Sequence, residues 1–413
     1  MWQMMKYSYL FRRKLIQPEM YLNKEVIGSY QTPYYYYDLE LLKTTLADIV
    51  RATDRPDYHV HYAFKANANQ PVLDLISDFG LGADCVSGNE IEKAIDSGFS
   101  SHSVVFAGVG KTDSEICFAL VNDIFCFNCE SIQEIEVINE LAGSLSKKAR
   151  IAIRINPDIN ACTHEYITTG LNENKFGIPV HQLNSVLEKI SASPNVILEG
   201  IHFHIGSQIT KMYVFRELCA KINRINLWFK EKGIDLNHIN VGGGLGIDYE
   251  FPQLNPIPDF TGYFDLFGKF LDLLPGQDLH FELGRSVVGQ CGTLVTKVLY
   301  IKEGVQYDFV VCDAGMTELM RPALYDAVHR IDNLSSIFTK TDNYTVVGPV
   351  CESSDCFGKG LQMPVTQRGD LLAIRSAGAY GEVMASSYNL RDKVNAVYMG
   401  SDQVLVPSSA LTD

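Results

Sequence analysis

Residues 61–69, HYAFKANAN, place one lysine, Lys65, at the end of an apolar run with the composition of a β-strand. Small and polar residues follow at once, as expected where a strand delivers a side chain into a pocket. A lysine amine held there, with its pKa lowered by its surroundings, can form a Schiff base with an aldehyde cofactor. Most lysines are instead solvated surface charges, so the interpretation depends on the rest of the chain.

Around this stretch, from residue 58 to about residue 288, β-rich runs alternate with amphipathic segments. The predicted strands end near Lys65, Val86, Ala107, Phe127, Ile155, His204, Val241 and Glu282. The predicted helices cover residues 71–79, 89–97, 131–142, 180–190, 213–230 and 263–274. This alternation predicts an α/β fold with a (β/α)₈ TIM-type barrel over residues 33–288. An open doubly wound sheet would also alternate, but its phosphate loop would follow the first strand, whereas the glycine run 242–244 comes late.

The residue pattern changes on both sides of the predicted barrel. After residue 289, short strand-like runs at 293–301, 309–312, 343–350, 370–376 and 395–399 are separated by turn residues. They predict a mostly β C-terminal domain over residues 289–413. At the other end, residues 1–32 are expected to pack with that domain, and Asp38 is a plausible N-cap of a helix that continues to Val50. A chain of 413 residues agrees with two domains.

Composition excludes several classes of partner. The net charge is −14 and no Lys/Arg cluster supplies a basic face, which argues against nucleic acid. No run reaches the ~18–20 apolar residues of a membrane span, and residues 1–17 lack the features of a secretory signal. Ten cysteines without the regular spacings of a disulfide framework indicate free thiols and no structural zinc site. We therefore expect a cytoplasmic protein with no membrane partner and no metal.

Three more groups of residues lie at predicted strand ends, where barrels of this kind form their active sites. Alternation directs His202 and His204 to one side; two histidines could bind a metal, but no third ligand follows at a recognisable spacing. The glycines at 242–244 expose backbone N–H groups that suit a phosphate, although tight turns use the same residues. Glu282 and Arg285 could pair with each other or bind separate parts of a ligand.

The second domain contributes further candidates. Cys351 is either a small buried hydrophobic residue or, beside Glu352 in a polar loop, a proton donor. Arg321 precedes Tyr325 by four residues, and Tyr380 ends the run GAY at 378–380. These polar groups predict ligand contacts outside the barrel.

Taken in order, six of these motifs resemble the signatures of the pyridoxal-phosphate-dependent decarboxylases of fold type III. They are YAFKAN at 62–67, HIGSQ at 204–208, GGG at 242–244, ExGR at 282–285, CES at 351–353 and GAY at 378–380. That family unites an alanine-racemase-type barrel with a β domain, and the resemblance runs from about residue 33 to residue 402. The chain departs from the family at Leu283, where proline is usual, and at Ser354, where glycine is usual.

The resemblance implies how pyridoxal 5′-phosphate would be bound. Lys65 would hold the cofactor as a Schiff base, His204 would stack on the pyridine ring, and Glu282 would pair with the ring nitrogen. Asp84 matches an acidic position near the cofactor. The residues expected around the phosphate are Ser207, Gly243, Gly244, Arg285 and Tyr380.

Within the family, the chain is most similar to the branch that converts meso-2,6-diaminopimelate to L-lysine and carbon dioxide, the final step of lysine biosynthesis. The residues expected to bind this substrate are Arg285, Arg321, Tyr325, Glu352 and Tyr380. Cys351 or Lys65 would return a proton to the α-carbon, and Cys351, with Glu352, would come from the other subunit of a homodimer. Lys65, His204, Glu282 and Cys351 are thus the expected catalytic residues.

Three alternatives stand beside this prediction. A sister decarboxylase acting on ornithine, arginine or carboxynorspermidine is one, but a plain distal amine would give Arg321 nothing to bind. A racemase is another, although that branch places an arginine at the ring nitrogen, where this chain offers Glu282. A catalytically silent homologue is the third, and it would not need the full set of expected catalytic residues that the chain contains.

Overall fold

The computed structural model describes residues 27–159, 175–400 and 404–405, the last two by their backbone alone. Most of the predicted N-terminal segment and most of the tail after residue 400 lie outside these residues. The chain forms two compact units. The barrel unit consists of Leu42–Ile247 and Ile257–Gly289, and the β unit of the described parts of Met1–Leu41, Asp248–Pro256 and Gln290–Asp413. No helix in the described ranges is long and apolar enough to cross a membrane.

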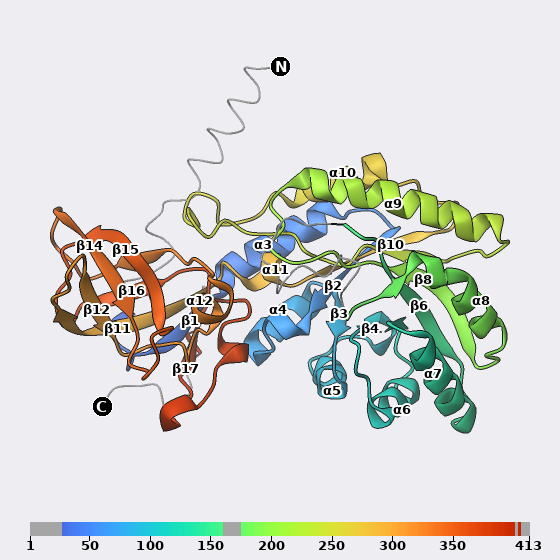
Figure 1. Ribbon diagram of the computed structural model, residues 1–413, viewed down its shortest axis with the longest axis horizontal. Helices are drawn as coiled ribbons and strands as arrows, with labels where there is room; N and C mark the ends of the chain where they lie inside the picture. Colours follow the sequence, from blue (N-terminus) through green and yellow to red (C-terminus); the bar gives the residue numbers. More distant parts are fainter. Residues whose placement is uncertain (1–26, 160–174, 401–403, 406–413) are drawn as a thin grey trace, which may run out of the picture. The chain divides into compact units, whose positions relative to one another are not determined.

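Parallel strands close into a barrel in the barrel unit (Figure 1). In barrel order they are β2 (Tyr58–Ala63), β3 (Gly82–Cys85), β4 (Val104–Phe106), β5 (Cys126–Cys129), β6 (Ala149–Asn156), β8 (Val196–His202), β9 (His238–Asn240) and β10 (Asp278–Leu283). The last strand, β10, pairs with the first, β2, and closes the barrel. A two-residue strand, β7 (Ile178–Pro179), pairs with the end of β6. The predicted TIM-type barrel is confirmed, and the open sheet is excluded.

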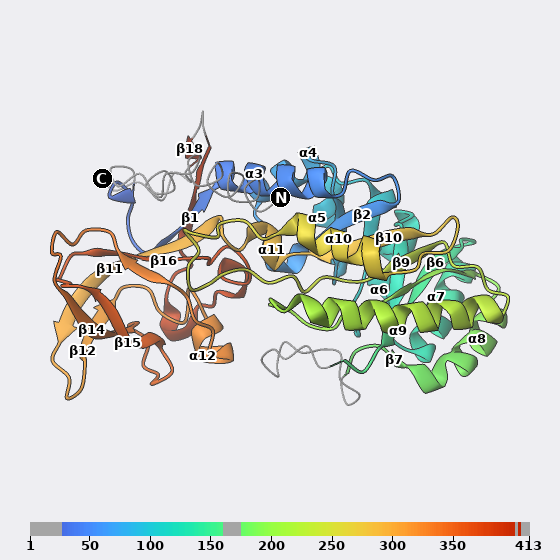
Figure 2. The ribbon, with the colours of Figure 1, turned by 90° about the horizontal axis from the view of Figure 1, so that it is seen from above.

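Helices cover the outside of the barrel, with α4 to α8 following one another around it (Figure 1). They are α4 (Gln70–Asp78), α5 (Gly88–Asp96), α6 (Asp113–Val121), α7 (Ile132–Ser144), α8 (Leu183–Ser191), α9 (Met212–Glu231), α10 (Phe260–Phe270) and α11 (Arg285–Val288). The long helices α9 and α10 lie side by side (Figure 2), and the ring of Phe215 packs edge-on against that of Tyr263 at 5.0 Å. The six predicted helices are present, and α6 and the short α11 are additional.

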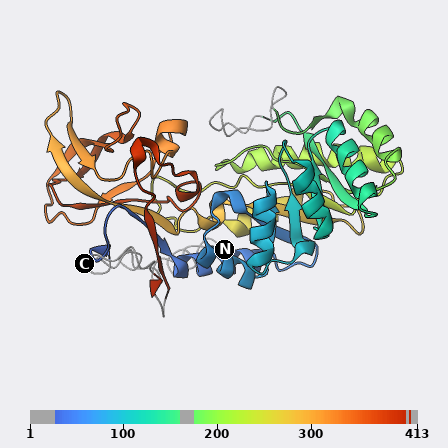
Figure 3. The same cartoon turned by 90° about the horizontal axis from the view of Figure 1, so that it is seen from below.

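One mixed sheet forms most of the β unit (Figure 3). Its strands are β1 (Tyr34–Asp38), β11 (Gly292–Lys302), β12 (Asp308–Cys312), β13 (Ile331–Asn333), β14 (Thr341–Val347), β15 (Cys356–Pro364), β16 (Leu371–Ile374), β17 (Asn395–Met399) and β18 (Val404–Leu405). The mostly β second domain is confirmed. β1, at the start of the range predicted for the barrel, pairs instead with β11 and β17 in this sheet. The next helix, α3 (Leu39–Ala52), begins as predicted, because Asp38 Oδ1 accepts the N–H of Leu41 at 2.8 Å.

Side chains inside the barrel change in character along its axis. Near the carboxyl ends of the strands they are polar and bonded across the interior, as where Asn128 of β5 reaches Glu282 of β10. Val105, Cys126 and Ala152 form an apolar cluster below. Histidines of β2, β9 and β10 gather toward the opposite end, where their rings contact one another. The polar carboxyl end therefore offers the chemistry of a site, in agreement with the usual place in this fold.

Candidate active site

Lys65 lies at the carboxyl end of β2, in the single helical turn Phe64–Ala66 whose two other residues are buried. Its Nζ donates a hydrogen bond to Asp84 Oδ2 at 2.5 Å. Asp84 is on β3, beside Ala63 in the strand register, so the pairing of β2 with β3 brings the two charges together. Burial and the nearby Glu282 raise the pKa of Asp84 to about 7, although Lys65 opposes them. The other carboxylate oxygen of Asp84 is buried without a hydrogen-bond partner.

Glu282 is a buried carboxylate at the end of β10. Its Oε1 accepts the side-chain amides of Asn128 at 2.9 Å and Asn240 at 2.8 Å, and its Oε2 accepts His202 Nε2 at 3.0 Å. Burial alone would raise the pKa of Glu282, but His202 and Lys65 lower it to a net value well below its usual range. A carboxylate offers about four acceptor positions, so an ionised Glu282 keeps one position on Oε2 for a further donor.

His204 and the glycine run lie next to Glu282. The N–H of Gly243 points at His204 Nδ1 at 3.3 Å. Burial, then the charges of Arg154 and Lys65, lower the pKa of His204 well below its usual range, which keeps the ring neutral. A Cβ on Gly243 would lie 1.8 Å from the carbonyl oxygen of Glu282. The loop approaches β10 as closely as it does only because residue 243 has no side chain.

The same contact predicts the effect of Gly243→Ala. Because the new Cβ would overlap a strand carbonyl, the loop or β10 must shift, with an expected loss of about 1–3 kcal/mol in the free energy of unfolding. We also expect weaker retention of pyridoxal phosphate, measured by dialysis and cofactor absorbance. The control is Gly110→Ala, where a Cβ meets nothing within 4 Å. Equal stability and cofactor retention in the two variants would contradict the packing argument.

Arg285 and Ser207 form a second polar group of the barrel unit. Arg285 begins α11 and is buried, and its Nε and Nη2 donate to Ser207 Oγ at 3.2 and 3.1 Å. A planar guanidinium held beside a hydroxyl is suited to an anion. Ser207 lies in the loop after β8 and Arg285 lies just after β10, so the fold brings together two residues that were predicted to bind the phosphate.

A buried lysine elsewhere in the barrel unit, Lys111, has a structural role and differs from Lys65 in its contacts. Lys111 is almost fully buried, and its Nζ donates to the carbonyls of Gly108 at 2.8 Å and Asn128 at 2.9 Å and to Glu134 at 2.5 Å. These three acceptors use all three protons of the ammonium. Lys65, by contrast, keeps a third of its side chain accessible, as a lysine that reacts with a ligand must.

The predicted substrate-binding residues of the β unit include one held in a fixed orientation. Arg321 is buried at the start of α12 (Arg321–Tyr325), and its Nη1 donates to Tyr249 Oη at 2.8 Å and to His329 Nε2 at 2.9 Å. The tautomer of His329 follows from its other nitrogen, which donates to the carbonyl of Arg375 at 2.8 Å. Tyr249 and His329 therefore orient the guanidinium, a role that no sequence motif indicated.

The other predicted site residues of the β unit are exposed or half-buried. Cys351 is exposed, so the alternative of a buried hydrophobic residue is excluded, and its N–H donates to Asn389 Oδ1 at 3.2 Å. Glu352 is also exposed and accepts the hydroxyl of Tyr388 at 2.7 Å. Tyr325 and Tyr380 are half-buried.

No sequence motif indicated the groups that support Glu282. Asn128 is the last residue but one of β5, Asn240 ends β9 two residues before the first glycine of the run, and His202 ends β8. Their common signal is a polar residue at the last inward position of a barrel strand. His202, weighed as half of a metal pair, is instead a hydrogen-bond donor to Glu282.

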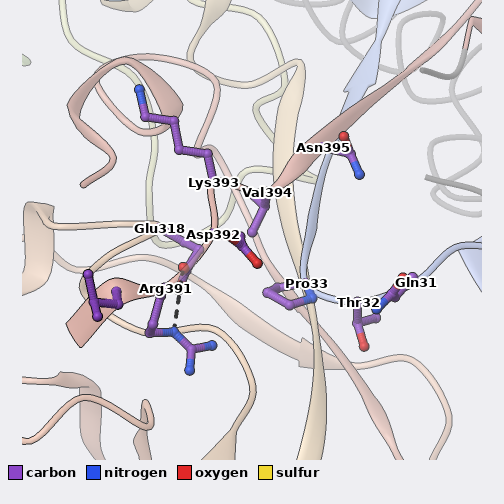
Figure 4. A pocket seen from close by; sticks show the side chains of 10 residues that line it. Gln31, Thr32, Pro33, Glu318, Arg391, Asp392, Lys393, Val394 and Asn395 are labelled. Atoms are coloured by element: carbon purple, nitrogen blue, oxygen red, sulfur yellow. Dashed lines mark ion pairs between the residues drawn. The ribbon is translucent and has the colours of Figure 1, made fainter. Parts of the chain in front are cut away.

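A separate polar pocket of about 480 Å³ lies in the β unit (Figure 4). Its lining residues are Gln31, Thr32, Pro33, Glu318, Leu390, Arg391, Asp392, Lys393, Val394 and Asn395. Glu318 and Arg391 form an ion pair of 4.0 Å there, and the Glu318 carboxylate also accepts the N–H of Gly315. None of the predicted site residues lines this pocket.

Comparison with known proteins places the chain in a family. The family described as "Pyridoxal-dependent decarboxylase, pyridoxal binding domain" matches residues 42–289, close to the extent of the barrel unit. The diaminopimelate decarboxylase of Bacteroides thetaiotaomicron is 54% identical over 88% of this chain and 94% of that protein. The chain belongs to the diaminopimelate decarboxylase family of pyridoxal-dependent decarboxylases. Membership in a decarboxylase family excludes the racemase alternative.

Solved members of the family share the whole architecture. Diaminopimelate decarboxylase from Helicobacter pylori, in complex with L-lysine, is 38% identical over 94% of this chain and 96% of that chain, with a TM-score of 0.87. The enzyme from M. jannaschii, also with L-lysine, is 36% identical over 93% of this chain and 90% of that chain, with a TM-score of 0.85. Lysine/ornithine decarboxylase from Vibrio vulnificus, at 20% identity, shares the fold.

The barrel residues fit the cofactor of this family, pyridoxal phosphate. An aldehyde can bond to the accessible amine of Lys65, and the orphaned oxygen of Asp84 lies beside it. Glu282 has one acceptor position left for a protonated ring nitrogen. Arg285 and Ser207 supply donors for a phosphate. The aldehyde, the ring nitrogen and the phosphate of the cofactor thus each have a residue of matching chemistry.

Proposed function

We propose that this protein removes carbon dioxide from meso-2,6-diaminopimelate and releases L-lysine, as the last step of lysine biosynthesis. The observation that carries the proposal is 54% identity to a diaminopimelate decarboxylase over almost the full length of both proteins. The carbon–carboxyl bond breaks at one end of the substrate, its electron pair stays on the α-carbon, and a proton replaces the carboxylate. Bound pyridoxal phosphate supplies the electron sink for this step.

Residues of the barrel would bind the pyridoxal phosphate and set its state of protonation. Lys65 Nζ provides the amine to which the cofactor aldehyde is attached. Asp84, with a pKa of about 7, can take up or return a proton at Nζ near neutral pH. Glu282 stays ionised and so favours a protonated ring nitrogen, and the neutral ring of His204 is suited to stack on the pyridine.

The phosphate and the substrate would be bound by two further sets of residues. Ser207, Gly243, Gly244, Arg285 and Tyr380 are the proposed phosphate ligands. Arg285 and Tyr380 would also lie close to the substrate, and Tyr325 would contact its distal end. Arg321, oriented by Tyr249 and His329, would bind the distal carboxylate in bidentate fashion, and Glu352 would bind the distal ammonium group.

Cys351 would deliver the proton to the α-carbon from Sγ, with Lys65 Nζ as the alternative donor. The loop that carries Cys351 and Glu352 is exposed in one chain, so it is available to the active site of a second copy, and we propose a homodimer with shared sites. The cysteines in the described parts of the chain are free thiols. Free thiols fit the cytoplasm as the compartment of the enzyme.

A substrate panel tests the proposal. We expect carbon dioxide release from meso-diaminopimelate and little from ornithine, arginine or lysine, because a plain distal amine leaves the buried Arg321 guanidinium without an anion. In the same assay, Arg321→Lys should raise KM for diaminopimelate by about tenfold or more, since lysine cannot bind a carboxylate in bidentate fashion.

The matched control is Arg368→Lys. Like Arg321 over Tyr249, Arg368 lies 5.0 Å over a tyrosine ring, that of Tyr300. Arg368 donates to one backbone carbonyl, but it is exposed and outside the proposed site. This variant should keep the wild-type KM. Carbon dioxide release from ornithine with none from diaminopimelate would overturn the assignment in favour of a sister decarboxylase.

A further inference from the structure

Three side chains at the amino end of the barrel bring metal-binding atoms together. His59 lies on β2, and Asp278 and His280 lie on β10. One ligand atom from each residue lies within 4.8 Å of the other two. His59 Nε2 and Asp278 Oδ2 are 3.4 Å apart. Two ligand atoms of a tetrahedral zinc ion with bonds of about 2.0 Å lie roughly 3.3 Å apart. The distance between His59 Nε2 and Asp278 Oδ2 therefore already suits two ligands of one zinc ion.

Strand pairing fixes the position of the group. His59 is the direct partner of His280 in the parallel pair of β2 with β10, and Asp278 is two residues before His280, on the same face. The side chains of His59 and Asp278 are 43% and 50% exposed, so both can rotate toward an ion that enters from solvent. His280 is buried and provides the fixed ligand.

A chain of hydrogen bonds selects the tautomer of His280. His61 Nδ1 lies 2.9 Å from the carbonyl oxygen of Ser103, which can only accept, so this nitrogen carries the proton. The other nitrogen of a neutral His61 must then accept, and it lies 2.8 Å from His280 Nδ1. His280 therefore donates from Nδ1 and keeps a lone pair on Nε2. Both rings are buried, where imidazole favours the neutral form.

The surroundings hold that lone pair in place. The ring of Phe125 stacks on that of His280 at 5.0 Å and 11°, which fixes the imidazole plane. His61 accepts the N–H of His280, as protein acceptors do in metal sites, where a ligating imidazole donates its other N–H to such a group. The ring of a further histidine, His238, lies 4.8 Å from that of His280.

We propose that His59, Asp278 and His280 bind a divalent transition-metal ion, Zn²⁺ in particular, across the strands that close the barrel. Two imidazoles and one carboxylate match the ligands that zinc takes in proteins, with water in the fourth position. The ion would join the first and last strands of the barrel and stabilise the folded state. His59 and Lys65 are six residues apart, roughly 20 Å along the chain, so the ion would not take part in decarboxylation.

Zinc titration of the untagged, full-length, cofactor-loaded enzyme tests the site, after treatment with a chelator. Calorimetry should show one Zn²⁺ per chain, and His59→Ala and Asp278→Asn should each weaken binding by about tenfold or more. Added zinc should raise the unfolding temperature of the wild type but not of these variants, and kcat should stay the same. Both substitutions are at exposed side chains, so folding should survive.

The matched control is His102→Ala. His102 also faces an aspartate, Asp123, at 3.8 Å, and both side chains are exposed. This variant should bind zinc as the wild type does. The proposal is overturned if the wild type takes up no zinc at micromolar concentration, if His59→Ala and Asp278→Asn bind it as tightly as the wild type, or if His102→Ala abolishes binding.

Discussion

Lys65→Ala is expected to lower decarboxylation by at least about a thousandfold, because it removes the nucleophile that acts together with the rest of the site. The variant should also lose the visible absorbance of covalently bound cofactor. Lys65 donates to Asp84, whose pKa burial has already raised, so the loss of the ammonium should raise that pKa further. Absorbance spectra of the purified enzyme measure the loss of bound cofactor, and carbon dioxide release measures the loss of decarboxylation.

Lys65→Arg separates the covalent role of the amine from its charge. The guanidinium keeps a cation beside Asp84 but cannot form the bond to an aldehyde. We expect this variant to fold as the wild type does and to be as inactive as Lys65→Ala. If Lys65→Arg recovered most of the activity, a charge beside Asp84 would be sufficient and the covalent assignment would be wrong.

The sequence predicted the barrel well because its signals are local. Each barrel strand is a short β-rich run, and most of them are followed by a helix with an apolar face. Helix α6 escaped prediction because its apolar residues are spread around the helix instead of forming one stripe. Its start is marked all the same, by a capping box in which Thr112 and Glu115 bond reciprocally.

Long-range pairing could not be predicted from local signals. β1 is a run of tyrosines next to α3, yet its partners are β11 and β17, more than two hundred residues away in the chain. The segment Asp248–Pro256 belongs to the β unit although barrel residues flank it. Its Tyr249 contacts Arg321, and its Gln253 donates to Asp332 at 2.6 Å. Nothing in the composition of these segments indicates such partners.

The same limit explains the uneven prediction of sites. Lys65, His204 and Glu282 stand in motifs that can be read one at a time, and their roles follow from a resemblance. The groups that tune them, Asn128 and Asn240, come from other strands and meet Glu282 only in the closed barrel. The proposed metal site has no motif at all, which is why the sequence analysis, attending to cysteines and to His202 and His204, expected no metal.

Glu282→Gln is expected to lower kcat by about a hundred- to a thousandfold while the cofactor stays bound. The amide has the shape of the carboxylate, and its oxygen can still accept the two asparagine amides. An uncharged side chain, however, no longer favours a protonated ring nitrogen, so the electron sink is weakened. Rapid-mixing measurements of carbon dioxide release, with cofactor content determined in parallel, separate the loss of rate from loss of cofactor.

The pH dependence of stability gives a second measure of the ionised Glu282. Its pKa in the folded state is lower than the ordinary value of 4.5. The charge therefore stabilises the fold above that pH, and this contribution is lost as the pH falls toward the folded value. The difference in unfolding temperature between wild type and Glu282→Gln should accordingly shrink below pH 4.5.

Glu134→Gln serves as the control for both measurements. Glu134 is a largely buried carboxylate of the same unit, and it pairs with Lys111 instead of a proposed cofactor residue. Its substitution should lower stability with little change in kcat. A Glu282→Gln enzyme that kept the wild-type kcat, or one that lost activity only in proportion to lost cofactor, would show that Glu282 positions the ring without tuning its charge.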